Sequence, residues 1–382
     1  MQVSKTWYPL LDVLRGPAAL LVFAEHWRNF FFQDFAQIEN PGIGLKVFYI
    51  FTGAGHEAVM LFFVLSGCVI AHVFYGMNAT NSWAWSRYLA ARLTRLWIVL
   101  IPALVLAFFW DTTGMWLAGS GDPVYSGAGF GNMVNVPVAE TSTLWIFVGN
   151  IFFGQKIFVP AFGSLWPSWS IAYEFMYYLA YPAVALALVP AMGRSWPVRI
   201  GYLLLAAGVL LFAGGRIAMS FPIWLAGAAA YLCFRRRPLQ GRFASLGFTF
   251  GLLLTVACIV GSRSGKDIPY VHWDWLIALT CGLAIYCGLG ANPGKLVSRL
   301  LKPLHQLSAV SYSLYLYHMP VLLFAAALTF TNSSERWAPN APNLLLGSLL
   351  ALVVFAYCLA GWSLTERNTG VIRKWSSKHF GI

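Results

Sequence analysis

Apolar runs of about twenty residues recur along the whole chain. Their approximate bounds are 8–31, 57–76, 89–110, 168–190, 199–213, 216–234, 243–262, 273–291, 308–331 and 343–365. A run of this length crosses a bilayer as a helix, because an α-helix satisfies its backbone hydrogen bonds within one segment. Only 10% of the 382 residues are charged and 59% are hydrophobic, whereas soluble domains carry about 25% charged residues. The sequence predicts an all-α polytopic membrane protein with about ten transmembrane helices.

The distribution of Lys and Arg predicts the topology. These residues are concentrated around the start of 89–110 (Arg87, Arg92 and Arg95), in 235–242, before 308–331 and after the last run, whereas residues 111–143 contain none. Short loops rich in Lys and Arg stay in the cytoplasm. All these loops lie on one side only if the interrupted apolar stretch 142–163 does not cross. We therefore predict that 142–163 is re-entrant or interfacial, and that both termini are cytoplasmic.

The chain shows no internal repeat, appended soluble domain or low-complexity linker, which predicts a single membrane domain over residues 1–382. The six cysteines lie in apolar runs without the spacing of metal ligands, so we expect neither a metal site nor a disulfide framework. The net charge of +12 fits basic loops beside anionic lipid headgroups. The expected partner of this charge is the lipid bilayer, not nucleic acid.

The first apolar run contains Arg15 and His26, which are eleven positions apart. Eleven helical residues turn through about 1100°, roughly 20° beyond three full turns, so the two side chains share one helix face. They lie about 16.5 Å apart along the axis. An arginine within a span faces the protein interior or an aqueous cavity. A structural Arg paired with a carboxylate, together with an interfacial His, is the alternative; the shared face favours a common cavity.

Arg92 and Arg95 stand one helical turn apart at the start of the third run. Two guanidinium groups there can hold phosphates through their planar donor forks, although positive-inside topology alone also accounts for them. Glu174 is the acidic residue set deepest in an apolar run, and His318 lies within the ninth run. Ionisable groups inside spans are functional candidates. The alternatives are that Glu174 neutralises an arginine and that His318 is a hydrogen-bonded structural group.

Five segments, in this order, resemble acyltransferase family 3, a family of integral-membrane enzymes that acylate carbohydrates and related envelope molecules. They are LDVLRGPAALLVFAEH, LFFVLSGCVIAH, RLTR, WSIAYEFMYYLAYP and SYSLYLYHMP. The resemblance extends from about residue 8 to residue 365. It departs at Met60, where many members carry an acidic residue directly before LFF. Glu57, three residues earlier, offers a carboxylate on nearly the same helix face.

The resemblance implies transfer of an acyl group, most often acetyl, from cytoplasmic acyl-CoA to a hydroxyl of a carbohydrate or glycolipid. It implies a multi-pass protein of the bacterial cytoplasmic (inner) membrane, with acetyl-CoA as a co-substrate and no tightly bound cofactor. Arg15, His26 and Glu174 are its implied catalytic residues, and Arg92 and Arg95 bind CoA. The implied substrate-binding residues are Glu57, Trp169, Ser170, Tyr312, Ser313, Tyr315 and His318.

The spacing of Arg15 and His26 suits this chemistry, since an extended pantetheine arm reaches about 15–20 Å. His26, with an unperturbed pKa of about 6.5, serves either as general base or as a transient acyl carrier. Arg15 stabilises an oxyanion or a CoA group. The acceptor, the acyl chain length and the oligomeric state, a homodimer included, are left open. The rival classes are a secondary transporter with a midplane polar site and a non-catalytic envelope-assembly factor.

Overall fold

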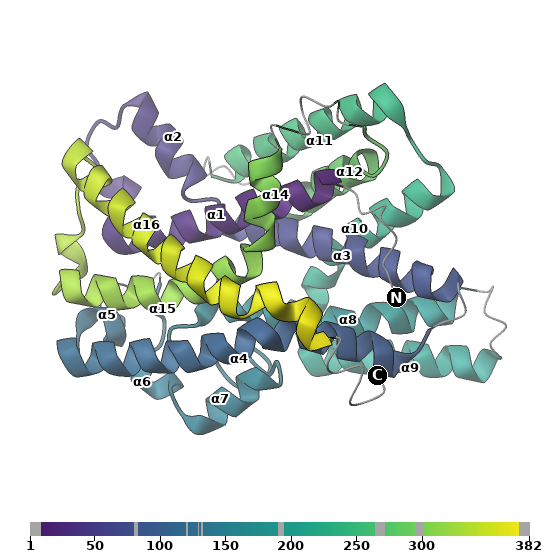
Figure 1. Cartoon of the computed structure of the whole chain (residues 1–382), viewed down its shortest axis with the longest axis horizontal. Coiled ribbons are helices and arrows are strands. Elements are labelled where there is room, and N and C mark those ends of the chain that lie inside the picture. The colour runs from purple at the N-terminus through teal and green to yellow at the C-terminus, as the bar shows by residue number, and fades with distance from the viewer. Residues whose placement is uncertain are drawn as a thin grey trace. The chain divides into compact units, whose positions relative to one another are not determined.

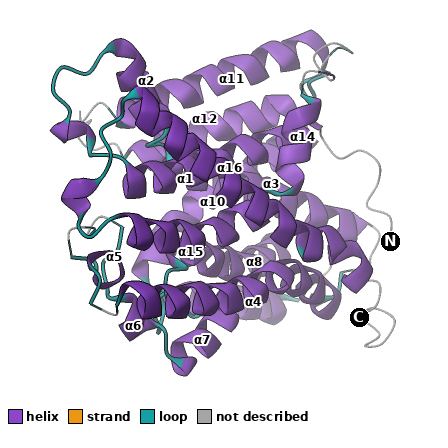
Figure 2. Ribbon diagram, turned by 60° about the vertical axis from the view of Figure 1, so that its left-hand side comes forward, coloured by secondary structure: helices purple, strands orange, loops and turns teal. Residues whose placement is uncertain are grey.

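The computed structural model describes residues 9–79, 83–119, 121–128, 130, 133–189, 195–263, 272–292, 294, 299 and 301–373. In these ranges the regular structure is helical, and the β-type pairing consists of two isolated bridges, Phe32 with Trp337 and Gln155 with Val159 (Figure 2). The predicted all-α fold is therefore confirmed. The predicted cytoplasmic location of both termini concerns residues 1–8 and 374–382, which lie outside the described residues.

Each predicted apolar run is a helix in the structure (Figure 1). The bounds are α1 Pro9–Phe31, α3 Gly55–Ala79, α4 Trp85–Ala118, α8 Trp169–Leu188, α9 Trp196–Ala213, α10 Gly215–Arg236, α11 Gly241–Ser262, α12 Trp273–Gly288, α15 Ser311–Thr329 and α16 Ala341–Leu364. Shorter helices are α2 Ile43–Phe51, α5 Pro123–Ser126, α6 Val138–Thr141, α7 Leu144–Ile151 and α14 Lys302–Ala309.

Within the described residues, 8 helices are long and apolar enough to cross a membrane. Two of the predicted runs fall outside this set. The first, α1, carries several charged residues, among them Arg15 and Glu25, and α12 has only 16 residues. The polytopic membrane class is thus confirmed, while the total of about ten spans stays a prediction.

Contacts within the chain divide it into two compact units. Unit 1 consists of Met1–Asp12, Met60–Arg92 and Ser170–Leu301. Unit 2 consists of Val13–Val59, Leu93–Trp169 and Lys302–Ile382. The prediction of a single membrane domain stays a prediction.

Unit 1 is packed through small residues. A Cβ atom at Gly67 of α3 would lie 2.0 Å from the Trp224 carbonyl oxygen of α10. At Gly227 of α10, a Cβ atom would lie 1.7 Å from the Val64 carbonyl oxygen. Only glycine permits these backbones to approach so closely, as is usual between membrane helices. Helices α11 and α12 lie side by side (Figure 1), and Gly251 packs there against the backbone of Ala284.

In unit 2, α15 runs beside α4 in the same direction. The Tyr312 hydroxyl donates to the Leu96 carbonyl at 3.1 Å, and further along both helices the Trp110 ring packs on Phe324 at 4.8 Å. Helix α1 packs on α16, where Trp27 Nε1 donates to the Gly347 carbonyl at 2.9 Å. These contacts bring α1, α4, α15 and α16 together in one unit.

The segment 142–163 is a hairpin that lies along α4. Its ends meet at Asp111, because Gly163 N donates to the Thr141 carbonyl at 3.2 Å and Ser164 N donates to Asp111 Oδ2 at 2.8 Å. Near its tip, Trp97 Nε1 donates to the Ile151 carbonyl at 2.8 Å. Trp97 and Asp111 are about 21 Å apart along the axis of α4. The segment therefore starts and returns at the same end of this stretch of α4, and its predicted re-entrant or interfacial position in the membrane stays a prediction.

Candidate active site

Two histidines meet inside unit 2, one on α1 and one on α15. His26 Nδ1 lies 2.7 Å from His318 Nε2, and the two rings stack with centroids 5.0 Å apart. On the other side of the second ring, His318 Nδ1 lies 2.6 Å from the Leu314 carbonyl oxygen of the preceding turn. His318 is fully buried, whereas His26 is half-buried. A continuous hydrogen-bonded chain therefore runs from His26 to the backbone of α15.

This hydrogen-bonded chain determines which ring nitrogens of the two histidines carry protons. A carbonyl oxygen only accepts, so His318 Nδ1 donates to Leu314. A neutral His318 then has a lone pair on Nε2, and this lone pair accepts from His26 Nδ1. A neutral His26 is consequently left with a lone pair on Nε2, for which the described residues provide no hydrogen-bond partner. The arrangement produces one oriented basic nitrogen.

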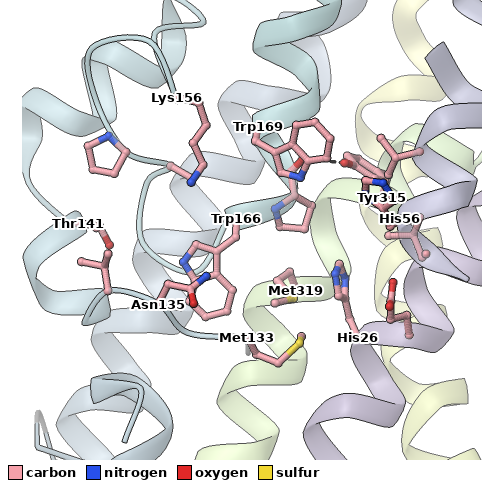
Figure 3. A pocket seen from close by; sticks show the side chains of 18 residues that line it. His26, His56, Met133, Asn135, Thr141, Lys156, Trp166, Trp169, Tyr315 and Met319 are labelled. Carbon is pink, nitrogen blue, oxygen red and sulfur yellow. Dashed lines mark hydrogen bonds between the residues drawn. The ribbon is translucent and has the colours of Figure 1, made fainter. Parts of the chain in front are cut away.

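His26 lines a cavity of about 300 Å³ in unit 2, which lies at the small end of the usual size range of ligand pockets (Figure 3). The walls come from α1, the start of α3, residues 133–141, the 142–163 hairpin, the turn at 166–169 and α15. The aromatic and sulfur-containing lining residues are Trp166, Trp169, Tyr315, Met133 and Met319, and the polar ones include Glu25, His56, Asn135, Thr141 and Lys156. The cavity therefore combines flat aromatic faces with a few polar groups.

Two hydrogen bonds hold the turn at 166–169, which carries Trp166 and Trp169. The Tyr315 hydroxyl of α15 donates to the Pro167 carbonyl at 2.7 Å. From the hairpin, Gln155 Nε2 donates to the Ser168 carbonyl at 2.9 Å. The side chain of Tyr315 thus orients the wall of the cavity as well as lining it.

The start of α3 closes the cavity against α1. A Cβ atom at Gly55 would lie only 2.0 Å from Glu25 Oε2, so a glycine is needed for this approach. His56 follows at once and lines the cavity. Glu57 is buried, with 4% of its surface exposed, but it does not line the cavity. The acidic residue that lines the cavity is Glu25.

A second polar cluster in unit 2 surrounds Glu366, in the turn after α16. Its Oε2 accepts from Ser313 N at 2.9 Å and from Ser313 Oγ at 2.8 Å. The positive charges of Arg95 and Arg15 both act on this carboxylate. Three residues that the sequence analysis singled out, Arg15, Arg95 and Ser313, thereby gather at one place.

The remaining predicted residues, Arg92, Ser170 and Glu174, belong to unit 1. Glu174 Oε1 accepts from Ser66 Oγ at 2.6 Å and from the Tyr178 hydroxyl. Its hydrogen-bond partners among the described residues are thus hydroxyl groups. The Arg92 guanidinium lies over the Tyr88 ring at 5.9 Å. The predicted roles of these three residues stay predictions.

Sequence reasoning therefore anticipated the two histidines and the arginines, but not all that surrounds them. Trp169 and Tyr315 line the cavity, whereas Tyr312 and Ser313 make hydrogen bonds elsewhere in unit 2. The substrate-binding roles predicted for these four residues stay predictions. In the sequence, Lys156 is only one of several residues that interrupt the apolar stretch 142–163. Glu366 was missed, since a single acidic residue near a basic chain end resembles a solvated one.

The comparisons with known proteins agree with this architecture. The acyltransferase domain of acyltransferase family 3 matches residues 8–362, nearly the whole chain. Searches among curated proteins and among solved structures found no match. A match over this length, together with apolar helices long enough to cross a membrane, defines the class of the protein. The chain belongs to acyltransferase family 3 and is a membrane acyltransferase.

Proposed function

We propose that the protein transfers an acyl group, most simply acetyl, from acyl-CoA to a hydroxyl group of a carbohydrate or glycolipid acceptor, with His26 as general base. The observation that carries the proposal is the hydrogen-bonded chain from Leu314 through His318 to His26. In this hydrogen-bonded chain the Nδ1–H of each ring donates toward α15. The lone pair of His26 Nε2 is left without a partner among the described residues, and His26 lines the cavity. A base in that position is what hydroxyl acylation requires.

In the proposed reaction the acceptor hydroxyl gives its proton to His26 Nε2 as its oxygen attacks the thioester carbon. A C–O bond forms, the C–S bond breaks, and the imidazolium returns the proton to the thiolate, which leaves as CoA-SH. His318 supports the intermediate charge, because the hydrogen bond from His26 Nδ1 becomes charge-assisted when His26 is protonated. His318 is thus a positioning residue in this scheme.

The same lone pair also serves the alternative route, in which His26 Nε2 attacks the thioester and carries the acyl group. The two routes differ in what happens without an acceptor. An acyl-histidine releases one equivalent of CoA in a rapid burst, whereas general-base transfer releases none. Mixing the purified protein with acetyl-CoA alone, and measuring free thiol, therefore separates the routes.

The donor is proposed to enter from the cytoplasm, with its phosphates held by Arg95 and Arg15 of unit 2; the predicted CoA contact of Arg92 stays a prediction. The grouping of Arg15 and Arg95 around Glu366 supports an anion site in unit 2. Along α1, Arg15 is about 16.5 Å from His26, a distance that an extended pantetheine arm of about 15–20 Å covers. The proposed location is the bacterial cytoplasmic membrane, with the bilayer as partner and no tightly bound cofactor.

The test is CoA release by the purified protein in detergent, with acetyl-CoA and a panel of sugar acceptors. The His26→Gln variant should bind acetyl-CoA normally and lose about 10²–10⁴-fold in turnover, the usual contribution of a positioned base. His305→Gln is the matched control, because His305 lies in unit 2 outside the lining of the cavity. Unchanged turnover in a folded His26→Gln protein would refute the role of His26. Acetyl-CoA binding without any thioester cleavage would favour the transporter class.

A further inference from the structure

Lys156 has no part in the scheme above, although it lines the same cavity as His26. The side chain is exposed, and within the described part of the chain it makes neither an ion pair nor a hydrogen bond. It is also the one Lys or Arg among the described residues that line the cavity. A cation in a re-entrant membrane segment is costly unless it faces water or a counter-ion, so its presence calls for a function.

The hairpin holds Lys156 in a fixed place. Its backbone has φ 65°, the left-handed region that residues with side chains rarely adopt. Two fully buried amides of the hairpin stabilise the loop through hydrogen bonds. Asn150 Nδ2 donates to the Ile146 and Pro160 carbonyls at 2.8 and 2.9 Å, and Gln155 Nε2 donates to the Ser168 carbonyl. The backbone of Lys156 is therefore built into the wall and does not belong to a loose loop.

The placement of Lys156 relative to the base is seen in Figure 3. Its side chain extends into the cavity on the side of Thr141 and Asn135, and in this view Trp166 lies between Lys156 and His26. Aromatic faces are suited to packing against the apolar faces of sugar rings. A sugar ring packed on Trp166 has the base toward one edge and a fixed positive charge toward the other.

We propose that Lys156 binds a carboxylate or phosphate carried by the acceptor, so that the preferred acceptor is an acidic sugar. This inference rests on the proposed acyl transfer to a carbohydrate hydroxyl. The ammonium group is a compact charge with three donors, suited to an anion whose orientation is set by other contacts.

The donor phosphates are a second source of anions, but a different cluster suits them. Arg15 and Arg95 act on Glu366, and Arg15 lies about 16.5 Å along α1 from His26. The reacting thioester carbon must lie beside His26, so the phosphates at the far end of the pantetheine arm reach the arginines. Lys156, in the wall of the cavity that contains His26, is left for the acceptor.

The test uses methyl β-glucuronide and methyl β-glucoside as probes. The glucuronide carries a carboxylate where the glucoside carries a hydroxymethyl group. Binding to the full-length protein is measured by calorimetry, and acetyl transfer from acetyl-CoA is measured in parallel. Wild-type protein should bind the glucuronide about tenfold to 100-fold more tightly, the usual effect of one charge-assisted hydrogen bond. Lys156→Gln should remove the preference for the glucuronide by raising its KM, with kcat nearly unchanged. Lys156→Arg should keep most of this preference. Lys46→Gln is the matched control, because Lys46 is exposed in unit 2 and outside the cavity lining.

Equal binding of the two probes to wild type, or no glucuronide binding, overturns the inference. It is also overturned if Lys156→Gln weakens both probes alike. A donor arm compares acetyl-CoA with acetylpantetheine, which lacks the phosphates. If Lys156→Gln instead weakens the binding of acetyl-CoA relative to acetylpantetheine, Lys156 binds the donor phosphates. Binding that follows the prediction without any acetyl transfer would leave this inference standing and count against the proposed function.

Discussion

Replacing His318 by Phe tests whether the second ring orients and supports the base. The variant keeps an aromatic ring of similar size in the buried position but removes the Nε2 lone pair that accepts from His26 Nδ1 at 2.7 Å. It also removes the Nδ1–H that fixes the ring against the Leu314 carbonyl. The chemistry of the His26 ring itself is untouched.

The expected magnitude follows from the change in that one hydrogen bond during the reaction. Between neutral groups it contributes about 0.5–1.5 kcal/mol, and once His26 is protonated about 1.5–3 kcal/mol. The difference of about 1–1.5 kcal/mol is what the bond adds in the transition state, or about five- to tenfold in kcat. The KM values for both substrates should stay close to wild type, because His318 lies outside the residues that line the cavity.

The assay is steady-state release of CoA by purified protein, with folding checked by size exclusion and thermal melting. His318→Gln is the companion variant, since its side-chain oxygen can accept from His26 and should restore part of kcat. In a His26→Gln background, His318→Phe should have no further effect, because the two rings act as one unit. The reasoning is refuted if His318→Phe retains kcat within about twofold of wild type, or if the Phe and Gln variants are equally impaired.

Three further predictions concern packing, acidity and the donor site. Gly227→Ala should lower the melting temperature of the detergent-solubilised protein through a loss of about 1–3 kcal/mol, because its Cβ meets the Val64 carbonyl oxygen at 1.7 Å; Gly208→Ala, with nothing within 4 Å, should not. Burial raises the pKa of Asp122, so ionisation there destabilises the fold increasingly as pH rises through the ordinary carboxyl pKa; Asp122→Asn should therefore raise the melting temperature at pH about 7 but not at pH about 3. Glu366→Gln should tighten acetyl-CoA binding, measured by calorimetry, because a carboxylate that competes with the donor phosphates is removed.

Each of these has a result that would contradict it. Equal melting temperatures for the two glycine variants would mean that α3 and α10 separate at little cost. A stabilisation by Asp122→Asn that persists in acid would point to a cause other than charge. Weaker or unchanged acetyl-CoA binding by Glu366→Gln would mean that Glu366 only orders the arginines and does not compete with phosphate.

The helices were predictable because a membrane span is defined by the composition of one continuous segment. The run 57–76 became α3 and the run 343–365 became α16, each with its ends shifted by a few residues. The helix α2, Ile43–Phe51, was not predicted, because a mostly apolar segment of nine residues is too short to distinguish a short helix from a buried loop.

The candidate site was only half predictable, for a physical reason. Helical spacing reports which side chains share one face, and this predicted Arg15 and His26 on one face of α1; of the two, His26 lines the cavity, whereas Arg15 acts on Glu366. The pairing of His26 with His318 joins positions 292 residues apart. It depends on how α1 packs against α15 and against α14, the short helix before it, where Gly16 N donates to Ser308 Oγ at 3.1 Å. The role of Lys156 depends in the same way on a loop folded back on itself, which no periodic pattern records.

The chain of two histidines and a carbonyl has a further consequence for an enzyme embedded in a bilayer. Unlike a relay built on a carboxylate, it adds no formal charge at rest, so it has little coupling to the transmembrane electric field, which acts with about 2.3 kcal/mol per elementary charge per 100 mV. In the proposed reaction, charge arises at His26 only for the lifetime of the intermediate, and the proton is returned within the same cycle. The proton-transfer step should therefore run at the same rate in energised and de-energised membranes.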